Sequence, residues 1–231
     1  MAPVECHTEW PTRPVPAPGR PRSGVAAPLR GPTRHGMDNP LGAARSGRAR
    51  LAELWSLIHE DWETHFRDWT KPGFRAMAMY RFGRWHLEIG NPLLRRLAGR
   101  IYKILHRYVR NQYGIELRCS ANVGRRLLLA HQGAIVIHSW AEIGDDCTIF
   151  QGVTLGSRNE EEFSPEKAPK LGNGVRVGAG AIVIGKVTIG DGSHIGPNTV
   201  VFTNVPAGAT VFTPPPRFVF PPDRRDEKGR P

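Results

Sequence analysis

The chain has 231 residues, 39% of them hydrophobic, and a formal net charge of +11. This length allows one domain with a sizeable core plus a smaller region. The sequence has neither an apolar run of ~18 residues nor an apolar signal segment, so we do not expect a membrane-spanning or secreted protein. Nucleic-acid binding is not expected either, because no recognition motif accompanies the charge and +5 of it comes from residues 1–50, which hold eight arginines and three acidic residues.

The first part of the chain lacks the periodicity of a folded element. Residues 1–48 are rich in Pro, Arg, Gly and Ala. Such a composition buries too little apolar surface to offset the loss of chain entropy on folding. We therefore expect a disordered leader over 1–48.

Residues 49–113 are expected to form a small helical region. Leu51, Leu54, Trp55 and Ile58 follow the i, i+3, i+4, i+7 spacing of one helical face. Pro72-Gly73 and Asn91-Pro92 separate this helix from two more, and Gly114 ends the third. The tryptophans and phenylalanines of the region are expected in its core.

From residue 114 onward the pattern has a period of six. Aliphatic residues recur without a gap at Leu171, Val177, Val183, Ile189, Ile195 and Val201. The same phase occurs earlier in the chain, at Val123, Leu129, Ile143, Ile149 and Leu155. A hexapeptide repeat is typical of a parallel β-helix, in which short strands stack coil upon coil. We expect this domain over 114–213, followed by an extended or disordered tail over 214–231.

Two interruptions of the repeat show where chemistry is expected. Val123 and Ile143 lie 20 residues apart, three hexapeptides plus two residues, so the chain must bulge within 130–140. Leu155 and Leu171 lie 16 residues apart, which predicts a loop between them. Because the surface of a solenoid is otherwise uniform, functional groups are expected where loops leave it.

The expected bulge contains two histidines, His131 and His138. An imidazole has a pKa near ~6.5 and can take a proton from a hydroxyl at neutral pH. From the residues alone, His131 is either such a general base or an exposed loop histidine.

These segments resemble the serine acetyltransferase family, hexapeptide acyltransferases with a left-handed parallel β-helix. The resemblance covers about 54–219 and is carried by GFRAMAMYRFGRW, YGIEL, AHQGAIVIHSWAEIGDD, QGVTLG, VGAGAIVIGKVTIGDGSHIG and VPAGATV. It implies transfer of acetyl from acetyl-CoA to a small-molecule hydroxyl, by default that of L-serine, the first step toward cysteine. It also implies the handedness and a trimer with acetyl-CoA between neighbouring β-helices. The short helical region favours a trimer over a hexamer.

The resemblance assigns roles to individual residues. His131 takes the position of the general base, and Glu116 takes that of the carboxylate that orients it. They lie fifteen residues apart, slightly less than one 18-residue coil, so they can be neighbours on stacked coils; alternatively, Glu116 is a solvated strand residue. His138 is expected at the surface or at a trimer interface, and His194 is expected to point outward without a role. The positions assigned to acetyl-CoA binding are Gly156, Ser157, Gly178, Ala179 and Arg217, with backbone N–H groups near Gly156 facing the oxyanion.

The sequence departs from the family pattern near the expected acceptor site. Ala130 replaces an Asp before the catalytic histidine, Lys167-Ala168 replaces an Arg-His pair, and Thr213 replaces a Gly of the closing segment. A site without its charged partners discriminates less for a charged ligand. The alternatives are therefore an O-acetyltransferase for a sugar or polysaccharide precursor, and a non-catalytic β-helix scaffold.

The remaining expectations concern cysteines, metals and partners. Cys6, Cys119 and Cys147 are odd in number and lack CxxC spacing, which predicts reduced thiols in a cytoplasmic protein. No metal constellation is visible, so no metal is expected. The charged tail lacks the terminal Ile through which many family members dock onto cysteine synthase, so that partner is not expected either.

Overall fold

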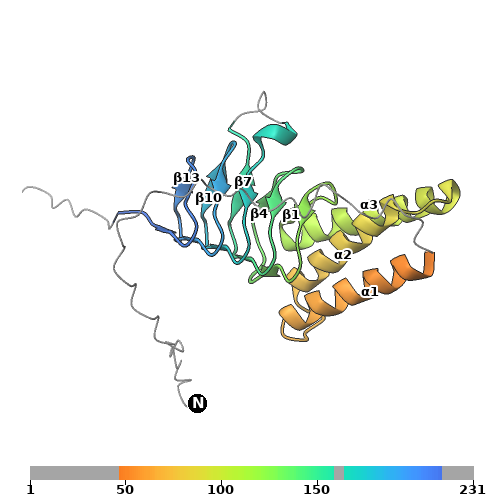
Figure 1. Cartoon of the computed structure of the whole chain (residues 1–231). Helices are drawn as coiled ribbons and strands as arrows, with labels where there is room; N and C mark the ends of the chain where they lie inside the picture. Colours follow the sequence, from red (N-terminus) through yellow and green to blue (C-terminus); the bar gives the residue numbers. More distant parts are fainter. Residues whose placement is uncertain (1–46, 159–163, 215–231) are drawn as a thin grey trace, which may run out of the picture.

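The computed structural model describes residues 47–158 and 164–214. The leader and the tail expected from the sequence fall almost entirely outside this part of the chain. A layer of helices stands at one end of a stack of short strands (Figure 1). No helix in the described part of the chain is both long and apolar enough to cross a membrane.

The helices begin and end where the local sequence directs. They are α1 Gly47–Thr64, α2 Pro72–Leu87 and α3 Pro92–Tyr113. Pro72 occupies the first turn of α2, where a backbone N–H would have no acceptor within the helix, so proline is tolerated there. Pro72-Gly73 therefore starts this helix instead of separating two helices. The Asn91 side chain accepts backbone N–H groups at the start of α3, and Gly114, with a φ of 62°, ends that helix in the left-handed conformation.

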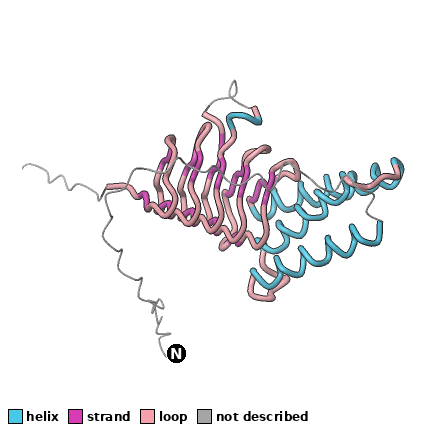
Figure 2. The backbone as a smooth tube through the Cα atoms, in the orientation of Figure 1, coloured by secondary structure: helices cyan, strands magenta, loops and turns pink. Residues whose placement is uncertain are grey.

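The strands wind into a left-handed parallel β-helix, as expected. They are β1 Ile115–Leu117, β2 Asn122–Val123, β3 Leu128–Leu129, β4 Ile135–Ile137, β5 Glu142–Ile143, β6 Thr148–Ile149, β7 Thr154–Gly156, β8 Lys170–Leu171, β9 Arg176–Val177, β10 Ile182–Ile184, β11 Thr188–Ile189, β12 His194–Ile195, β13 Val200–Val201 and β14 Thr210–Val211. Each full coil adds one strand to each of three parallel sheets, which form the three walls of the rod. Figure 2 shows these short strands stacked coil upon coil. We call them sheet A (β1-β4-β7-β10-β13), sheet B (β2-β5-β8-β11) and sheet C (β3-β6-β9-β12-β14).

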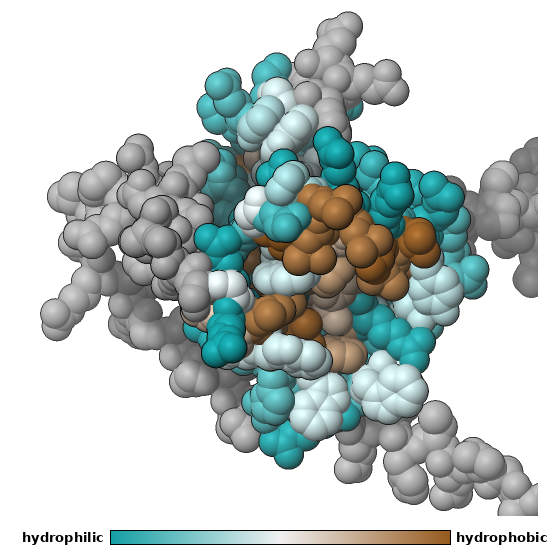
Figure 3. Space-filling model, turned by 90° about the vertical axis from the view of Figure 1, so that its right-hand side faces the viewer, coloured by the Kyte–Doolittle hydropathy of each residue, from teal (hydrophilic) through white to brown (hydrophobic). Residues whose placement is uncertain are grey.

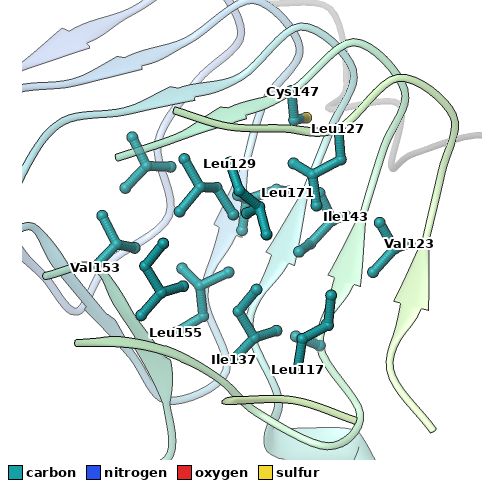
Figure 4. Close-up of a cluster of buried hydrophobic side chains, with 14 of the residues drawn as sticks. Leu117, Val123, Leu127, Leu129, Ile137, Ile143, Cys147, Val153, Leu155 and Leu171 are labelled. Atoms are coloured by element: carbon teal, nitrogen blue, oxygen red, sulfur yellow. The ribbon is translucent and has the colours of Figure 1, made fainter. Parts of the chain in front are cut away.

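The aliphatic repeat residues form the core of this rod. Leu171, Val177, Val183, Ile189 and Ile195 are at most 2% exposed, and their counterparts in earlier coils point into the same interior (Figure 4). Burial of each such side chain contributes about 1.5–3 kcal/mol to the free energy of folding, relative to leaving it exposed to water. Both expected interruptions are confirmed: residues 130–134 bulge between β3 and β4, and β8 begins only at Lys170 after β7 ends at Gly156.

The helical region is anchored to the first coil through a buried ion pair. Arg81 of α2 donates to both Asp61 carboxylate oxygens, at 2.8 and 3.2 Å, and both side chains are almost fully buried. The same guanidinium donates to the backbone carbonyls of Val123 and Gly124, at the end of β2. Arg81 therefore joins α1, α2 and the β-helix in one network.

The expectation of an aromatic core in the helical region is wrong for several residues. Trp55 is 67% exposed, Trp69 is 66% exposed, and Phe66 is 70% exposed. The helix α1 packs mainly on α2 and reaches the β-helix through the ion pair of Glu60 with Arg125, and the fully buried residue that it contributes is Asp61. A helical stripe in the sequence therefore did not identify which face of α1 is covered.

Asp61→Ala should destabilise the protein by about 3–5 kcal/mol, because it leaves the buried Arg81 guanidinium without its counter-ion. The measurement is denaturant unfolding followed by circular dichroism. Glu63→Ala is the matched control, since Glu63 pairs with Arg67 on the solvent-exposed side of the same helix. An equal loss of stability in both variants would contradict this role of the buried pair.

Candidate active site

Most of the candidate residues that the structure describes lie on the edges of the rod, where the chain passes from one sheet to the next. The C–A edge comprises the turns between sheets C and A: residues 130–134, 150–153, 178–181 and 196–199. The A–B edge comprises the described residues of the turns between sheets A and B: 118–121, 138–141, 157–158, 164–169, 185–187 and 202–204. Because the strands of sheet A are parallel, these edges lie at opposite ends of that sheet.

His131 is displayed on the C–A edge, in the two-residue bulge. Its side chain is exposed, and its ring lies 6.1 Å from that of Phe150 on the next coil. The bulge is held by the coils before and after it. The carbonyl of Gly133 accepts the N–H of Gly152 on the following coil. On the preceding coil, Gly114 packs so closely that a Cβ there would lie 3.0 Å from the nitrogen of Ala134. The imidazole is thus presented to solvent by a fixed backbone.

The helical region supports this bulge through a histidine that the sequence did not single out. The Nε2 of His65 accepts the N–H of Leu129 at 3.3 Å, and its Nδ1 donates to the carbonyl of Asp61 at 2.6 Å. One accepting and one donating nitrogen correspond to the neutral imidazole. Gly73 also touches this strand, since a Cβ there would come within 2.3 Å of the Leu129 carbonyl oxygen. Leu129, two residues before His131, is therefore fixed by α2 and by His65, the residue that follows α1.

Glu116 lies in the middle of β1, facing outward between the buried Ile115 and Leu117. Its carboxylate is 3.5 Å from the guanidinium of Arg118. His106 of α3 lies nearby: burial and then the charge of Arg118 lower the pKa of His106, and the charge of Glu116 acts in the opposite direction. The structure thus places Glu116 in a cluster with Arg118 and His106. Glu116 is connected to the bulge through the backbone: Gly114, two residues before it, packs against Ala134.

The residues expected to bind acetyl-CoA divide between the two edges. Gly178 and Ala179 lie on the C–A edge, where successive turns are hydrogen-bonded in a column that reaches the His131 bulge. Gly156 ends β7 and Ser157 follows it, on the A–B edge. Arg217 lies outside the described residues. One protomer therefore does not bring His131 and Gly156 to the same end of sheet A.

Two further histidines test the expectations. His138 is 5% exposed in the single chain, so the expectation of a surface residue is wrong, and the alternative of a trimer-interface residue stays a prediction. Its Nδ1 accepts the N–H of Trp140 at 3.3 Å. Burial lowers the pKa of His138. His194 is exposed on sheet C beside Thr210, as expected.

Other parts of the described structure offer a cavity but no cluster of metal ligands. A cavity of about 180 Å³ lies between α1, α2 and β2, with Arg50, Arg84 and Trp85 in its lining, away from His131. Within residues 47–158 and 164–214, no three His, Cys, Asp or Glu side chains gather as metal ligands would. His131, an exposed imidazole on the C–A edge, is therefore the candidate catalytic group among the described residues.

The sequence and the fold are similar to those of known proteins. A family profile described as "Bacterial transferase hexapeptide (six repeats)" matches residues 168–203. A serine acetyltransferase of Helicobacter pylori (strain J99) is 40% identical over 139 residues, which cover 60% of this chain and 76% of that protein. A serine acetyltransferase of Synechococcus elongatus is 35% identical over 149 residues, which cover 64% of this chain and 57% of that protein. The chain thus spans little more than half the length of the Synechococcus relative.

A solved structure shares the architecture as well. The crystal structure of a serine acetyltransferase from Vibrio cholerae superposes with a TM-score of 0.60 at 26% identity. The match covers 72% of this chain and 66% of that one. It therefore extends beyond the repeats matched by the family profile.

His65→Gln should make the stability of the protein less dependent on pH. Burial lowers the pKa of His65, so the folded ring stays neutral at pH values where the unfolded chain, with a pKa near ~6.5, already binds a proton. Stability is therefore complete above about pH 6.5 and falls as the pH drops below it toward the folded pKa. Glutamine can still accept the Leu129 N–H but does not titrate.

The measurement is the loss of Tm between about pH 7.5 and about pH 5.5, which should be smaller in His65→Gln than in the wild type. His194→Gln, at an exposed histidine, should keep the wild-type slope. Identical slopes in all three proteins would show that His65 is not held neutral by its burial.

Proposed function

Because the chain belongs to the serine acetyltransferase family, we propose that it moves an acetyl group from acetyl-CoA to the hydroxyl of L-serine, with His131 as general base. The observation that carries this proposal is the relative that is 40% identical over 76% of its own length. The exposed His131, held on a rigid edge next to Phe150, supports the assignment of the base.

The proposed reaction follows from the chemistry of the imidazole. A neutral ring nitrogen of His131 accepts the hydroxyl proton as the oxygen attacks the thioester carbonyl. The C–O bond forms, the C–S bond breaks, and the leaving thiolate takes a proton from the imidazolium. Backbone N–H groups near Gly156 stabilise the oxyanion between these steps. The proposed part of Glu116 is to favour the imidazolium electrostatically, as a carboxylate on β1, the strand paired with the β4 strand that follows the bulge.

We propose a homotrimer as the active form, because the site residues lie at opposite ends of sheet A. A neighbouring copy that brings its A–B edge to the C–A edge of the first unites Gly156 of one chain with His131 of the other. Exposed apolar side chains support such contact: Val136 (41% exposed) and Val200 (50%) on the outward side of sheet A, and Phe202 (57%) on the A–B edge. The net charge of +11 favours a polyanionic donor such as acetyl-CoA in the interface.

A second candidate acceptor is a sugar hydroxyl, which the alanines at two positions expected to bind the acceptor favour. Ala130 precedes His131, and Ala168, 1% exposed, closes the long loop after β7. Neither side chain can pair with the ammonium or carboxylate of an amino acid. The mechanism is the same for both acceptors.

His131→Ala should lower kcat by at least the ~10² that a general base typically supplies. The measurement is release of the CoA thiol, followed with a thiol reagent, in protein whose mass by light scattering is unchanged. His194→Ala is the control, since His194 lies on sheet C away from the bulge. Near-normal turnover in His131→Ala would remove His131 from the mechanism.

The acceptor is tested by comparing L-serine with a panel of sugars and nucleotide sugars in the same assay. We expect acetyl-CoA-dependent thiol release with serine, and the product identified by mass as O-acetylserine. Release with sugars alone would assign the second acceptor. If purified wild-type protein neither binds acetyl-CoA nor releases thiol with any acceptor, the chain is a non-catalytic scaffold.

A further inference from the structure

The helix α3 carries an apolar stripe that its own protomer leaves uncovered. It packs inward through a different stripe, which includes Ala98, Tyr102 and Val109. The uncovered residues are Leu93 (74% exposed), Leu94 (49%), Leu97 (55%), Ile101 (43%), Ile104 (68%), Leu105 (39%) and Tyr108 (51%). Apolar surface is correspondingly visible at the helical end of the molecule (Figure 3). A contiguous patch of this kind marks an interaction surface.

The spacing within the stripe is that of a coiled coil. Leu94, Leu97, Ile101, Ile104 and Tyr108 follow one another at alternating intervals of three and four residues. This is the a/d repeat through which parallel helices interlock, with Leu94, Ile101 and Tyr108 at a and Leu97 and Ile104 at d. Isoleucine at both a and d, as at Ile101 and Ile104, favours more than two helices.

We propose that this stripe is a self-association seam, along which the α3 helices of neighbouring copies of this chain pack in parallel. The inference rests on the three-fold assembly proposed above, and it assigns the helical region a part in that assembly. In Figure 1, α3 runs along the direction in which the coils stack. A three-fold axis along the β-helix therefore keeps three α3 helices parallel to one another.

The charges of α3 select the parallel arrangement. The helix contains Arg95, Arg96, Arg100, Lys103, Arg107 and Arg110 and no acidic residue. In a parallel seam, the g-position Arg100 lies opposite the e-position Leu105 of the neighbour, and its methylene stem covers that leucine. In an antiparallel seam g positions face each other, so Arg100 and Arg107 would meet cations. Like charges in contact destabilise the antiparallel pairing.

The seam depends on the rod for its stability. It covers only about two heptads, and isolated helices of that length are marginal in water. Joining the chains through their β-helices raises the effective concentration of one α3 for the next, so a short seam suffices. A lipid surface also takes up apolar stripes beside cations, but it does not require the a/d spacing that this stripe has.

The test is site-specific cross-linking in the full chain, in a background with Cys6→Ser. Leu97→Cys places a thiol at a d position, so the thiols of two chains should be joined by a short bis-maleimide into a covalent dimer on denaturing gels. Lys103→Cys, on the exposed opposite side of the same helix, should give no more dimer than the background protein with Cys119 and Cys147. Equal cross-linking at 97 and 103, or none at 97 in protein that is trimeric by light scattering, would overturn the seam.

A second pair of variants measures the seam without a new thiol. Ile104→Glu should raise the concentration at which the assembly dissociates at least tenfold, whereas Lys103→Glu should leave it unchanged. If Leu97→Cys does not cross-link and vesicles containing anionic phospholipid bind the wild type but not Ile104→Glu, the stripe serves a membrane and the proposal is wrong. Thiol release is assayed in parallel: cross-linking without turnover contradicts the proposed enzyme alone, and turnover without cross-linking contradicts the seam alone.

Discussion

The structure depends on the parallel hydrogen bonding of each coil to the next. Glu116 pairs with Val136, Val136 with Thr154, and the same register continues along sheet A to the last coil. In such a stack, a shift of one residue would turn the aliphatic set outward and expose the core. Two surplus residues before Ile135 therefore cannot be absorbed within the strands, and they project as the bulge that presents His131.

The same constraint places chemistry on the edges. Side chains on the outward faces of the strands are displayed along flat sheets, whereas turns can vary in length without disturbing the core. Two turns of this chain are longer than the repeat requires: the bulge after β3 and the connection after β7. They lie at opposite ends of sheet A. In the proposed reaction, a single rod therefore carries two half-sites. The proposed trimer follows from this division, because a second rod is the simplest source of the missing half.

The helical region helps to fix the C–A edge, because it is bonded to the strands that precede the His131 bulge. The Arg81 network binds α1 and α2 to the end of β2, and His65 binds them to the end of β3. Replacing water around Asp61 and Arg81 has a large desolvation cost, which is offset only because the guanidinium also satisfies two carbonyls. Fixing Leu129 in this way limits how the bulge can move, and α3 continues from the same layer directly into β1.

The sequence by itself determined the rod, its core positions and its two interruptions, because a six-residue period and its breaks are local and can be counted along one chain. It also identified His131 as the residue at the break, together with its family. Only the tertiary structure decided that Trp55 is exposed, that His138 is buried and that Glu116 contacts Arg118. It alone revealed the contact of His65 with Leu129, 64 residues away. Such contacts depend on how a helix rotates and docks against a distant strand, and the spacing of residues along either segment does not specify that orientation.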